Sequence, residues 1–376
     1  MLWIPGPTQV RPELLAEMAR PAIGHRSAAM TELIERIAEH LPFAFGLRDD
    51  SSAATAVHSA SATGMMEASL LGAGPKVLCM VNGAFSKRWA QVASSLGRDV
   101  TVLEAPLGST VSPERLSTTL KEQGHFDALT YVLSETSTGT LTPPEDVAQV
   151  MRDHPETMVL TDCVSAIAGR PIDFDDQRID FAFAGVQKAL ALPPGIAVVC
   201  ASEHYLEQAQ NVPARGFYLD PLRFIEGHQQ RKPPITPAIP HYYALAQQLE
   251  DISAGRTLPA SDQHKRGAEA WQARFDKHAR MQARTMAWAA SHGTALLPEA
   301  RLASPCVSCI RAAHIDVPSL LAGLAQRGLV LGNGYGELKN TTFRVGHMGD
   351  HSEAGLEELL QAADEVLASN RHQNED

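Results

Sequence analysis

Short apolar runs alternate with longer stretches of helical spacing over the first two-thirds of the chain. The runs are bounded by glycine, proline or polar residues, as buried strands are. They predict strands at Lys76–Val81, Val100–Glu104, Ala128–Ser134, Met158–Asp162, Asp180–Ala184 and Gly195–Cys200. The longer stretches predict helices at Gly64–Leu71, Ser86–Ser95, Pro113–Gln123 and Pro144–Asp153. This alternation predicts an α/β fold whose mostly parallel sheet is covered on both faces and binds ligands beyond the carboxyl ends of its strands.

The pattern changes after a proline-rich segment at 230–240. Tyr242–Ser291 is largely helical in spacing and carries many charges, and a smaller α+β unit follows. In that unit we expect strands at Cys306–Ala312 and Thr342–Val345 and helices at Val317–Arg327 and Ser352–Ser369. We therefore predict a boundary near residue 250, between a large domain over 21–250 and a small C-terminal domain over 251–376.

Composition and charge narrow the class of protein. The chain is 44% hydrophobic and 20% charged, which is ordinary for a soluble globular protein. Its net charge of −11 argues against nucleic acid or an anionic membrane as a main partner. The five cysteines are odd in number and widely spread, and the first residues lack the pattern of a signal peptide, so we expect a cytoplasmic protein. The 15 histidines have no paired ligand spacing, which predicts no metal site.

Two charged residues stand where such a sheet binds its ligands. Asp162 ends the apolar run Met158–Asp162, and Lys188 follows the run Asp180–Ala184. Either residue alone has an ordinary interpretation, because an aspartate at a strand end is usually a turn or cap residue and a single lysine is usually solvated. Their order and spacing within one sheet favour a shared site. A partly buried lysine amine can condense with an aldehyde, and a carboxylate can keep a pyridine nitrogen protonated.

Two further segments add candidate ligand contacts. Ser59–Glu67 places small and hydroxyl-bearing residues at the start of a predicted helix, where backbone N–H groups and the helix dipole attract phosphate. A plain serine or threonine N-cap is the alternative interpretation. In Asn82–Arg88, Phe85 is suited to stack on a ring or to lie in the core, and Arg88 is suited to substrate, phosphate or the surface.

These segments, taken in order, resemble the class V aminotransferases, which are pyridoxal-phosphate (PLP) enzymes of fold type I. The resemblance is to the alanine–glyoxylate and serine–pyruvate (serine–glyoxylate) group in particular, and it extends from about residue 5 to residue 350. No single motif is specific for this family, but the occurrence of all of them in one order is highly specific for it. The motifs are Pro5–Thr8, Gly24–Arg26, Ser61–Thr63, Asn82–Phe85, Glu135–Gly139, Asp162–Ser165, Gly185–Lys188 and Phe343–Gly349.

The resemblance implies a role for each matching residue, on a seven-stranded large-domain sheet. Lys188 would carry the cofactor as a Schiff base, and Asp162 would bind its ring nitrogen. Phosphate contacts would come from Ser61, Ala62, Thr63 and Gln187, with Thr236 reaching the phosphate of the neighbouring subunit in a homodimer. Phe85 would stack on the ring, Val164 would pack under it and Thr136 would lie near its phenolic oxygen. Arg344 would clamp the substrate α-carboxylate, and Gly6, within an N-terminal segment over 1–20, would approach the substrate.

The implied reaction is ping-pong transamination between a small L-amino acid of the alanine or serine type and a 2-oxo acid such as glyoxylate or pyruvate. The chain departs from the family where Ala60 and Ala62 replace common glycines, so the loop should avoid the left-handed region there. It departs again at Pro233, where a tyrosine is frequent. Proline has no hydroxyl group, so it cannot make the phosphate contact that the tyrosine would make.

Other functions are weighed against this one. A phosphoserine-type aminotransferase shares the fold, and so does a lyase of the cysteine desulfurase kind, which would use Cys306, although a buried structural thiol is the better interpretation of that residue. A non-catalytic protein of the same fold is disfavoured by the intact Asp162, Lys188 and Arg344. A nicotinamide enzyme is disfavoured because the glycines at 72 and 74 precede a strand. The identity of the donor, and the roles of Arg26 and Arg88, stay open.

Overall fold

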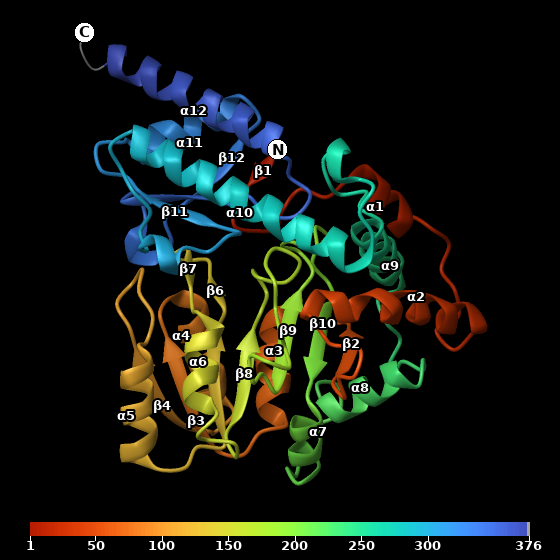
Figure 1. Cartoon of the computed structure of the whole chain (residues 1–376). Helices are drawn as coiled ribbons and strands as arrows, with labels where there is room; N and C mark the ends of the chain where they lie inside the picture. The colour runs from red at the N-terminus through yellow and green to blue at the C-terminus, as the bar shows by residue number, and fades with distance from the viewer. Residues whose placement is uncertain (374–376) are drawn as a thin grey trace.

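The computed structural model describes residues 1–373, and its larger part is built on one seven-stranded sheet (Figure 1). In spatial order the strands are β2 Ala54–His58, β10 Ala197–Ala201, β9 Phe181–Gly185, β8 Met158–Asp162, β5 Ala128–Val132, β3 Lys76–Val81 and β4 Asp99–Glu104. Neighbours pair in parallel except at β10, which runs antiparallel to both β9 and β2. The mostly parallel seven-stranded sheet expected from the sequence is confirmed.

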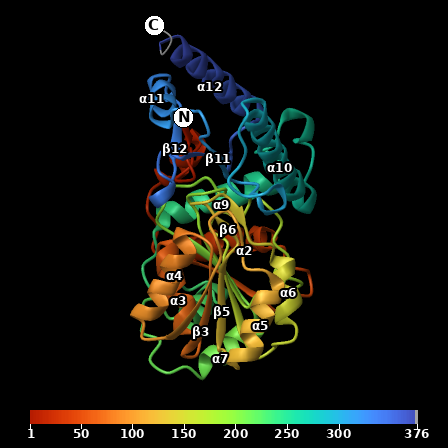
Figure 2. The ribbon, with the colours of Figure 1, turned by 90° about the vertical axis from the view of Figure 1, so that its left-hand side faces the viewer.

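Helices cover both faces of this sheet, which explains why its strands are apolar along their whole length. Figure 2 shows α3 and α4 on one side and α5 and α6 on the other. Alternate residues of β3 enter different cores: Leu78 and Met80 join the one that contains α5, whereas Val77 and Cys79 join the one that contains α3. The covering helices are α2 Ala28–Phe45, α3 Ala62–Leu71, α4 Ala84–Ser95, α5 Pro113–Gln123 and α6 Pro144–Met151.

Four more helices accompany the larger part: α1 Pro12–Met18, α7 Glu203–Gln210, α8 Pro221–Gln229 and α9 Ile239–Ser253. The helical stretch predicted over Tyr242–Ser291 divides here into α9 and a second helix, α10 Gly267–Ser291. Gly255 explains the break, because its φ of +72° is left-handed and a Cβ there would lie 2.7 Å from the Lys265 carbonyl oxygen. The predicted boundary near residue 250 falls inside α9, and the division into domains stays a prediction.

The smaller part is a four-stranded sheet packed against three helices, which lie at the top of Figure 1. Its strands, in spatial order, are β1 Leu2–Trp3, β12 Val330–Asn333, β13 Thr342–Val345 and β11 Ser308–Arg311, and its helices are α10, α11 Val317–Gln326 and α12 Glu353–Gln373. The first residues of the chain thus complete the C-terminal sheet, since β1 pairs in parallel with β12. No helix among the described residues is both long and apolar enough to cross a bilayer.

Candidate active site

A cavity of about 310 Å³ lies at the carboxyl ends of β5, β8 and β9, the edge of the sheet that Figure 1 shows facing the smaller part. Six separate segments contribute to its wall: the N-terminal segment, the starts of α3 and α4, and the ends of β5, β8 and β9 with the loops that follow them. The predicted site residues that line it are Gly6, Ser61, Ala62, Thr63, Phe85, Thr136, Asp162, Val164, Gln187 and Lys188. Residues far apart in the sequence are therefore brought to one place, as parallel strand ends should do.

Lys188 follows β9, and its side chain is buried with the amine at the cavity. Burial lowers the pKa of this amine to about 8; the nearby Asp162 carboxylate opposes that shift, and the Arg344 guanidinium adds to it. The amine donates a hydrogen bond to the Pro5 carbonyl oxygen. A Cβ at the adjacent Gly6, whose φ is +118°, would lie 2.5 Å from Nζ. Any residue larger than glycine at position 6 would therefore clash with the amine of Lys188.

Asp162 ends β8, and its carboxylate is 4% exposed. Burial raises the pKa of this carboxyl to about 7, and the N–H group of Val164, which donates to Oδ1 at 2.8 Å, moderates the shift. No other donor within residues 1–373 bonds this carboxylate. The second oxygen thus lacks a protein partner in a cavity where a buried carboxylate requires one.

The start of α3 forms another part of the cavity wall. Ser61 is the N-cap, and its hydroxyl oxygen accepts a hydrogen bond from the N–H group of Gly64 at 3.2 Å. The N–H groups of Ala62 and Thr63, in the first turn, have no acceptor in the described part of the chain. Neither Ala60 nor Ala62 is among the described residues with positive φ, so the expectation of a non-left-handed loop is confirmed. This helix end can bind an anion.

Arg344 lies on β13, beside the cavity rather than in its wall. Its Nε donates to the carbonyl oxygen of Asn333 at 2.9 Å, and its NH1 donates to that of Thr136 at 3.1 Å. The guanidinium is half-buried and lies 5.7 Å from the centroid of the Tyr335 ring, and burial lowers its pKa. Two carbonyls therefore fix its plane next to Thr136 while NH2 stays available for a carboxylate.

Glu135 is a site residue that the sequence motif contained without a role. It belongs to the short hairpin of β6 Ser134–Glu135 and β7 Thr140–Leu141 and is fully buried. Its Oε2 accepts from the N–H groups of Phe85 and Ser86 at 2.9 and 3.0 Å, and its Oε1 accepts from the Ser137 hydroxyl at 2.6 Å. Glu135 thus fixes the start of α4, and with it Phe85, by bonds that no local pattern reveals. Glu135 does not itself line the cavity; the lining residues without a predicted role are Pro7, Met66, Val132, Ser134, Ser165 and Pro194.

Other candidates lie outside the cavity. Thr236 is exposed and does not line it, and Arg26 is exposed beside His25. Cys306 is fully buried, and burial raises the pKa of its thiol to about 12, so the interpretation as a structural thiol fits. Arg88 does line the cavity, with its guanidinium 5.0 Å from the centroid of the Phe85 ring.

The shifted Lys188 amine leads to a test that needs no ligand. With its pKa near 8, about 300-fold more of the amine is neutral at pH 7 than for a lysine of ordinary pKa. Only the neutral amine reacts with formaldehyde, so in the ligand-free protein we expect reductive methylation of Lys188 to rise with pH around a midpoint near 8, as mass spectrometry of peptides can measure. The same lysine in the urea-unfolded protein is the control and should react only at higher pH. Equal pH profiles in the two states would contradict the buried amine.

Comparison with known proteins agrees with this arrangement. Residues 16–295 match the family model Aminotransferase class-V. An uncharacterized aminotransferase of Methanocaldococcus jannaschii is 31% identical over 353 residues, which cover 93% of this chain and 88% of that protein. A serine–glyoxylate aminotransferase of Methylorubrum extorquens is 29% identical, over 98% of this chain and 91% of that one.

A solved structure shares the fold over nearly the whole chain. The crystal structure of an aspartate aminotransferase from Thermus thermophilus has a TM-score of 0.85 and 28% identity, and the match covers 98% of this chain and 99% of that one. The fold type I architecture expected from the sequence is confirmed by this likeness. Family match, fold and cavity agree, and the chain belongs to the class V aminotransferases, enzymes that use pyridoxal phosphate.

Proposed function

We propose that this aminotransferase moves the amino group of a small L-amino acid, of the alanine or serine type, to a 2-oxo acid such as glyoxylate or pyruvate by a ping-pong mechanism. The observation that carries the proposal is the meeting of three groups: the amine of Lys188 and the carboxylate of Asp162 line one cavity, and the guanidinium of Arg344 lies beside it. An amine, a buried carboxylate and a fixed cation are what transamination of an α-amino acid requires.

The residues present fit pyridoxal phosphate. The free oxygen of Asp162 is suited to a protonated ring nitrogen, and the N–H groups of Ala62 and Thr63 are suited to a phosphate. Ser61 and Gln187 would complete the phosphate site, Phe85 and Val164 would hold the ring, and Thr136 would contact its phenolic oxygen, since all five line the cavity. When bound, the cofactor supplies an electron sink that lets the Cα–H bond of an amino acid break near neutral pH.

The protein's own groups orient the donor and move its proton. Arg344 binds the donor α-carboxylate through its free NH2 and so fixes the direction of the Cα–H bond. The amine of Lys188, with a pKa near 8, takes that proton as a general base and returns it as a general acid. Asp162 keeps a proton on the ring nitrogen, and Gly6 leaves the amine free to move.

The charges around the cavity support a small, uncharged donor side chain. Among the residues that line it, the basic ones are Lys188 and Arg88. The guanidinium of Arg88 lies 5.0 Å from the centroid of the Phe85 ring, and its charge lowers the pKa of Asp162, so we assign it to the cofactor side of the cavity. Among the described lining residues, no further cation is thus left to bind an acidic donor side chain. The name of the Methylorubrum relative agrees with such a donor, whereas that of the Thermus structure points to an acidic one.

The proposal includes a homodimer with shared sites and a cytoplasmic location. Ser61 and Thr63, which would hold the phosphate, are exposed in one chain, as expected where a second chain covers part of the site. Thr236, exposed on the segment before α9, would provide that contact in the partner's site. The five cysteines are all free, as expected in a reducing compartment.

A substrate panel tests the proposal. We expect alanine or serine with glyoxylate or pyruvate to give the highest kcat/KM, and aspartate and phosphoserine to be at least about tenfold poorer, since a missing counter-charge costs roughly 1.4 kcal/mol or more. Product amino acids would be quantified by chromatography. A preference for aspartate would move the assignment to an acidic donor, and release of sulfide from cysteine would move it to the lyases.

Replacement of Arg344 is expected to affect donor binding. In Arg344→Gln the charged NH2 group that would hold the α-carboxylate is lost, so KM for the amino donor should rise at least about tenfold, as for the loss of a charge-assisted hydrogen bond. Arg311→Gln is the matched control, because Arg311 is exposed on the adjacent strand β11. Steady-state kinetics with varied donor measures both, and an unchanged KM in Arg344→Gln would remove this residue from the donor site.

A further inference from the structure

A single buried guanidinium contacts both loops that carry the reactive groups. Arg274 lies within α10 and is 0% exposed. Its Nε donates to the carbonyl oxygen of Ala168, in the loop that follows Asp162, at 3.1 Å. Its NH2 donates to the carbonyl oxygen of Ala189, the residue after Lys188, at 2.6 Å. A helix of the smaller part thereby holds the backbone on which the lysine and the aspartate are mounted.

The third contact of this guanidinium leads to the strand of Arg344. NH1 of Arg274 donates to Oδ1 of Asp350 at 2.9 Å, and Asp350 follows β13 along the chain. Oδ2 of Asp350 accepts from Nε of Arg11, at 2.6 Å, which adds the N-terminal segment to the cluster. The ion pair between Arg274 and Asp350 therefore joins the two reactive loops to the segment that follows β13. That strand carries Arg344, which is proposed to bind the donor.

Two neighbours of Arg274 hold the same segment. Lys277 Nζ donates to the carbonyl oxygen of Gly349 at 3.0 Å, and the Gly349 N–H group donates to Nε2 of His278 at 3.0 Å. Gly349 has a φ of +81°, and a Cβ there would lie 3.4 Å from the carbonyl oxygen of Lys188. The segment after β13 thus packs directly on the lysine loop, and α10 fixes it at three adjacent points.

The two loops also contain strained backbone. Ala168 has a φ of +57° and Ala191 one of +55°, a region that alanine rarely adopts and that persists only where the surroundings enforce it. Arg274 bonds the carbonyl of Ala168 itself and that of Ala189, two residues before Ala191. A buried ion pair gives little net stability, since desolvation offsets its attraction. These bonds are therefore better explained by the geometry they impose than by stability.

We propose that Arg274 and Asp350 are positioning residues that set Lys188 and Asp162 relative to Arg344, and so couple the donor site to the cofactor site. The proposal rests on the function proposed above for these three residues. Neither Arg274 nor Asp350 lines the cavity, so they act through the backbone of the residues that do.

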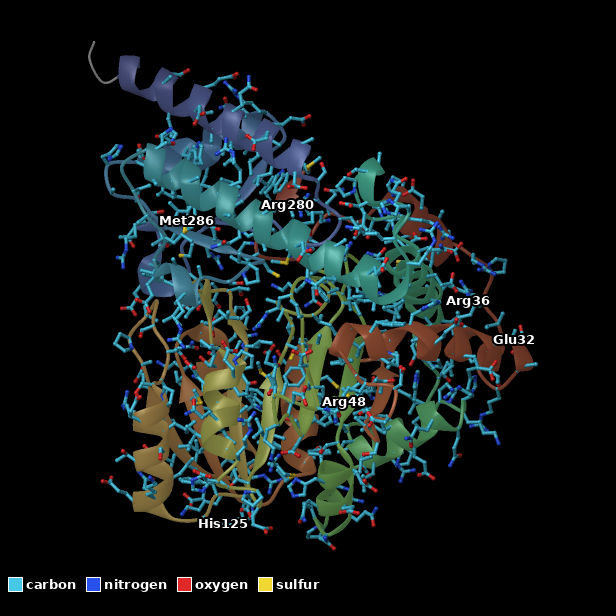
Figure 3. All side chains as sticks on the ribbon, in the orientation of Figure 1. Glu32, Arg36, Arg48, His125, Arg280 and Met286 are labelled. Carbon is cyan, nitrogen blue, oxygen red and sulfur yellow. The ribbon has the colours of Figure 1, made fainter. Side chains whose placement is uncertain are left out.

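Arg274→Lys tests the proposal, because lysine keeps the charge but cannot hold three acceptors in one plane. Arg280→Lys is the matched control on the same helix (Figure 3): Arg280 pairs with Glu353 through two bonds, is half-exposed and does not line the cavity. We expect kcat/KM to fall about 100-fold in Arg274→Lys, as for a small misplacement of reacting groups, and the dissociation constant of pyridoxal phosphate to rise about tenfold. Arg280→Lys should match the wild type in both.

Two further readouts separate positioning from simple loss of stability. The pH midpoint of the bound cofactor's absorbance should shift in Arg274→Lys, a change that partial unfolding would not cause. Asp350→Asn, which keeps the side-chain shape, should raise the donor KM while the cofactor binds nearly as in the wild type. The cofactor readouts need no substrate, so they test Arg274 even where no proposed donor reacts. A folded Arg274→Lys protein with the midpoint, cofactor affinity and kcat/KM of Arg280→Lys would overturn the proposal.

Discussion

Replacing Lys188 with alanine is expected to lower kcat for transamination by at least about 10⁴-fold, because one amine provides both the covalent attachment and the proton transfer at Cα. The fold should survive, since the side chain lines a cavity and its removal leaves space that water can fill. Formation of pyruvate from alanine, coupled to its reduction by lactate dehydrogenase, measures the loss.

Lys87→Ala is the control for this substitution. Lys87 is an exposed lysine on α4, close in sequence to the lining residues but outside the cavity, so its loss should leave kcat within twofold of the wild type. Lys188→Ala protein that retains a tenth of the wild-type kcat would show that another group moves the proton, and the proposed role of Lys188 would be wrong.

The second large effect is expected for Asp162→Asn, where kcat should fall about 10³-fold. The amide has nearly the same volume as the carboxyl and can still accept from the N–H group of Val164, so the loop should keep its shape. It carries no charge, however, and cannot stabilise a proton on the ring nitrogen. We expect the loss in kcat, with donor KM changed far less, because the charge is needed in the transition state more than in binding.

Asp153→Asn serves as the control, since Asp153 is exposed at the end of α6 and lies outside the cavity. Steady-state kinetics on both variants at saturating donor gives the comparison. If Asp162→Asn kept kcat within threefold of that control, the buried carboxylate would have a structural role only.

Much of the larger sheet could be predicted from the sequence, because a parallel sheet buried on both faces makes each strand an apolar run. Lys76–Val81 and Met158–Asp162 occur as β3 and β8 with the predicted bounds. Predicted strand Gly195–Cys200 is β10, shifted to Ala197–Ala201, and it pairs antiparallel with β9. Edge strand β1 was not predicted, because its two residues are too few to have a periodic pattern. Its partner, β12, lies near the other end of the chain.

Helix α2 was not predicted, although it is long. It contains Pro42, a residue that usually interrupts a helix. Its apolar residues Ile34 and Ile37 have helical spacing and lie in the core that α9 shares, so the packed apolar face outweighs a proline that stands only in the last turn. Local pattern and final structure differ most where the stabilising contact comes from a distant segment.

The site residues divide in the same way, into those with a local sequence signal and those whose role depends on distant contacts. Lys188, Asp162 and the start of α3 were found because each follows or precedes a strand in a motif of fixed order. Glu135 was within a quoted motif, but its role depends on bonds to Phe85 and Ser86, fifty residues away. Arg274 gave no signal at all, since a single arginine in a charged helical stretch reads as solvated until the structure shows it fully buried.

The central claim, that this chain is a transaminase for small amino acids, is tested most directly by the absorbance spectrum of the purified protein with bound pyridoxal phosphate. Alanine, serine, aspartate and phosphoserine would be added singly, with Lys188→Ala as the control. We predict that alanine or serine abolishes the visible band of the bound cofactor, that glyoxylate or pyruvate restores it, and that Lys188→Ala does neither at a comparable rate. A protein that takes up no pyridoxal phosphate, or whose band persists while pyruvate or sulfide is released, would contradict the account.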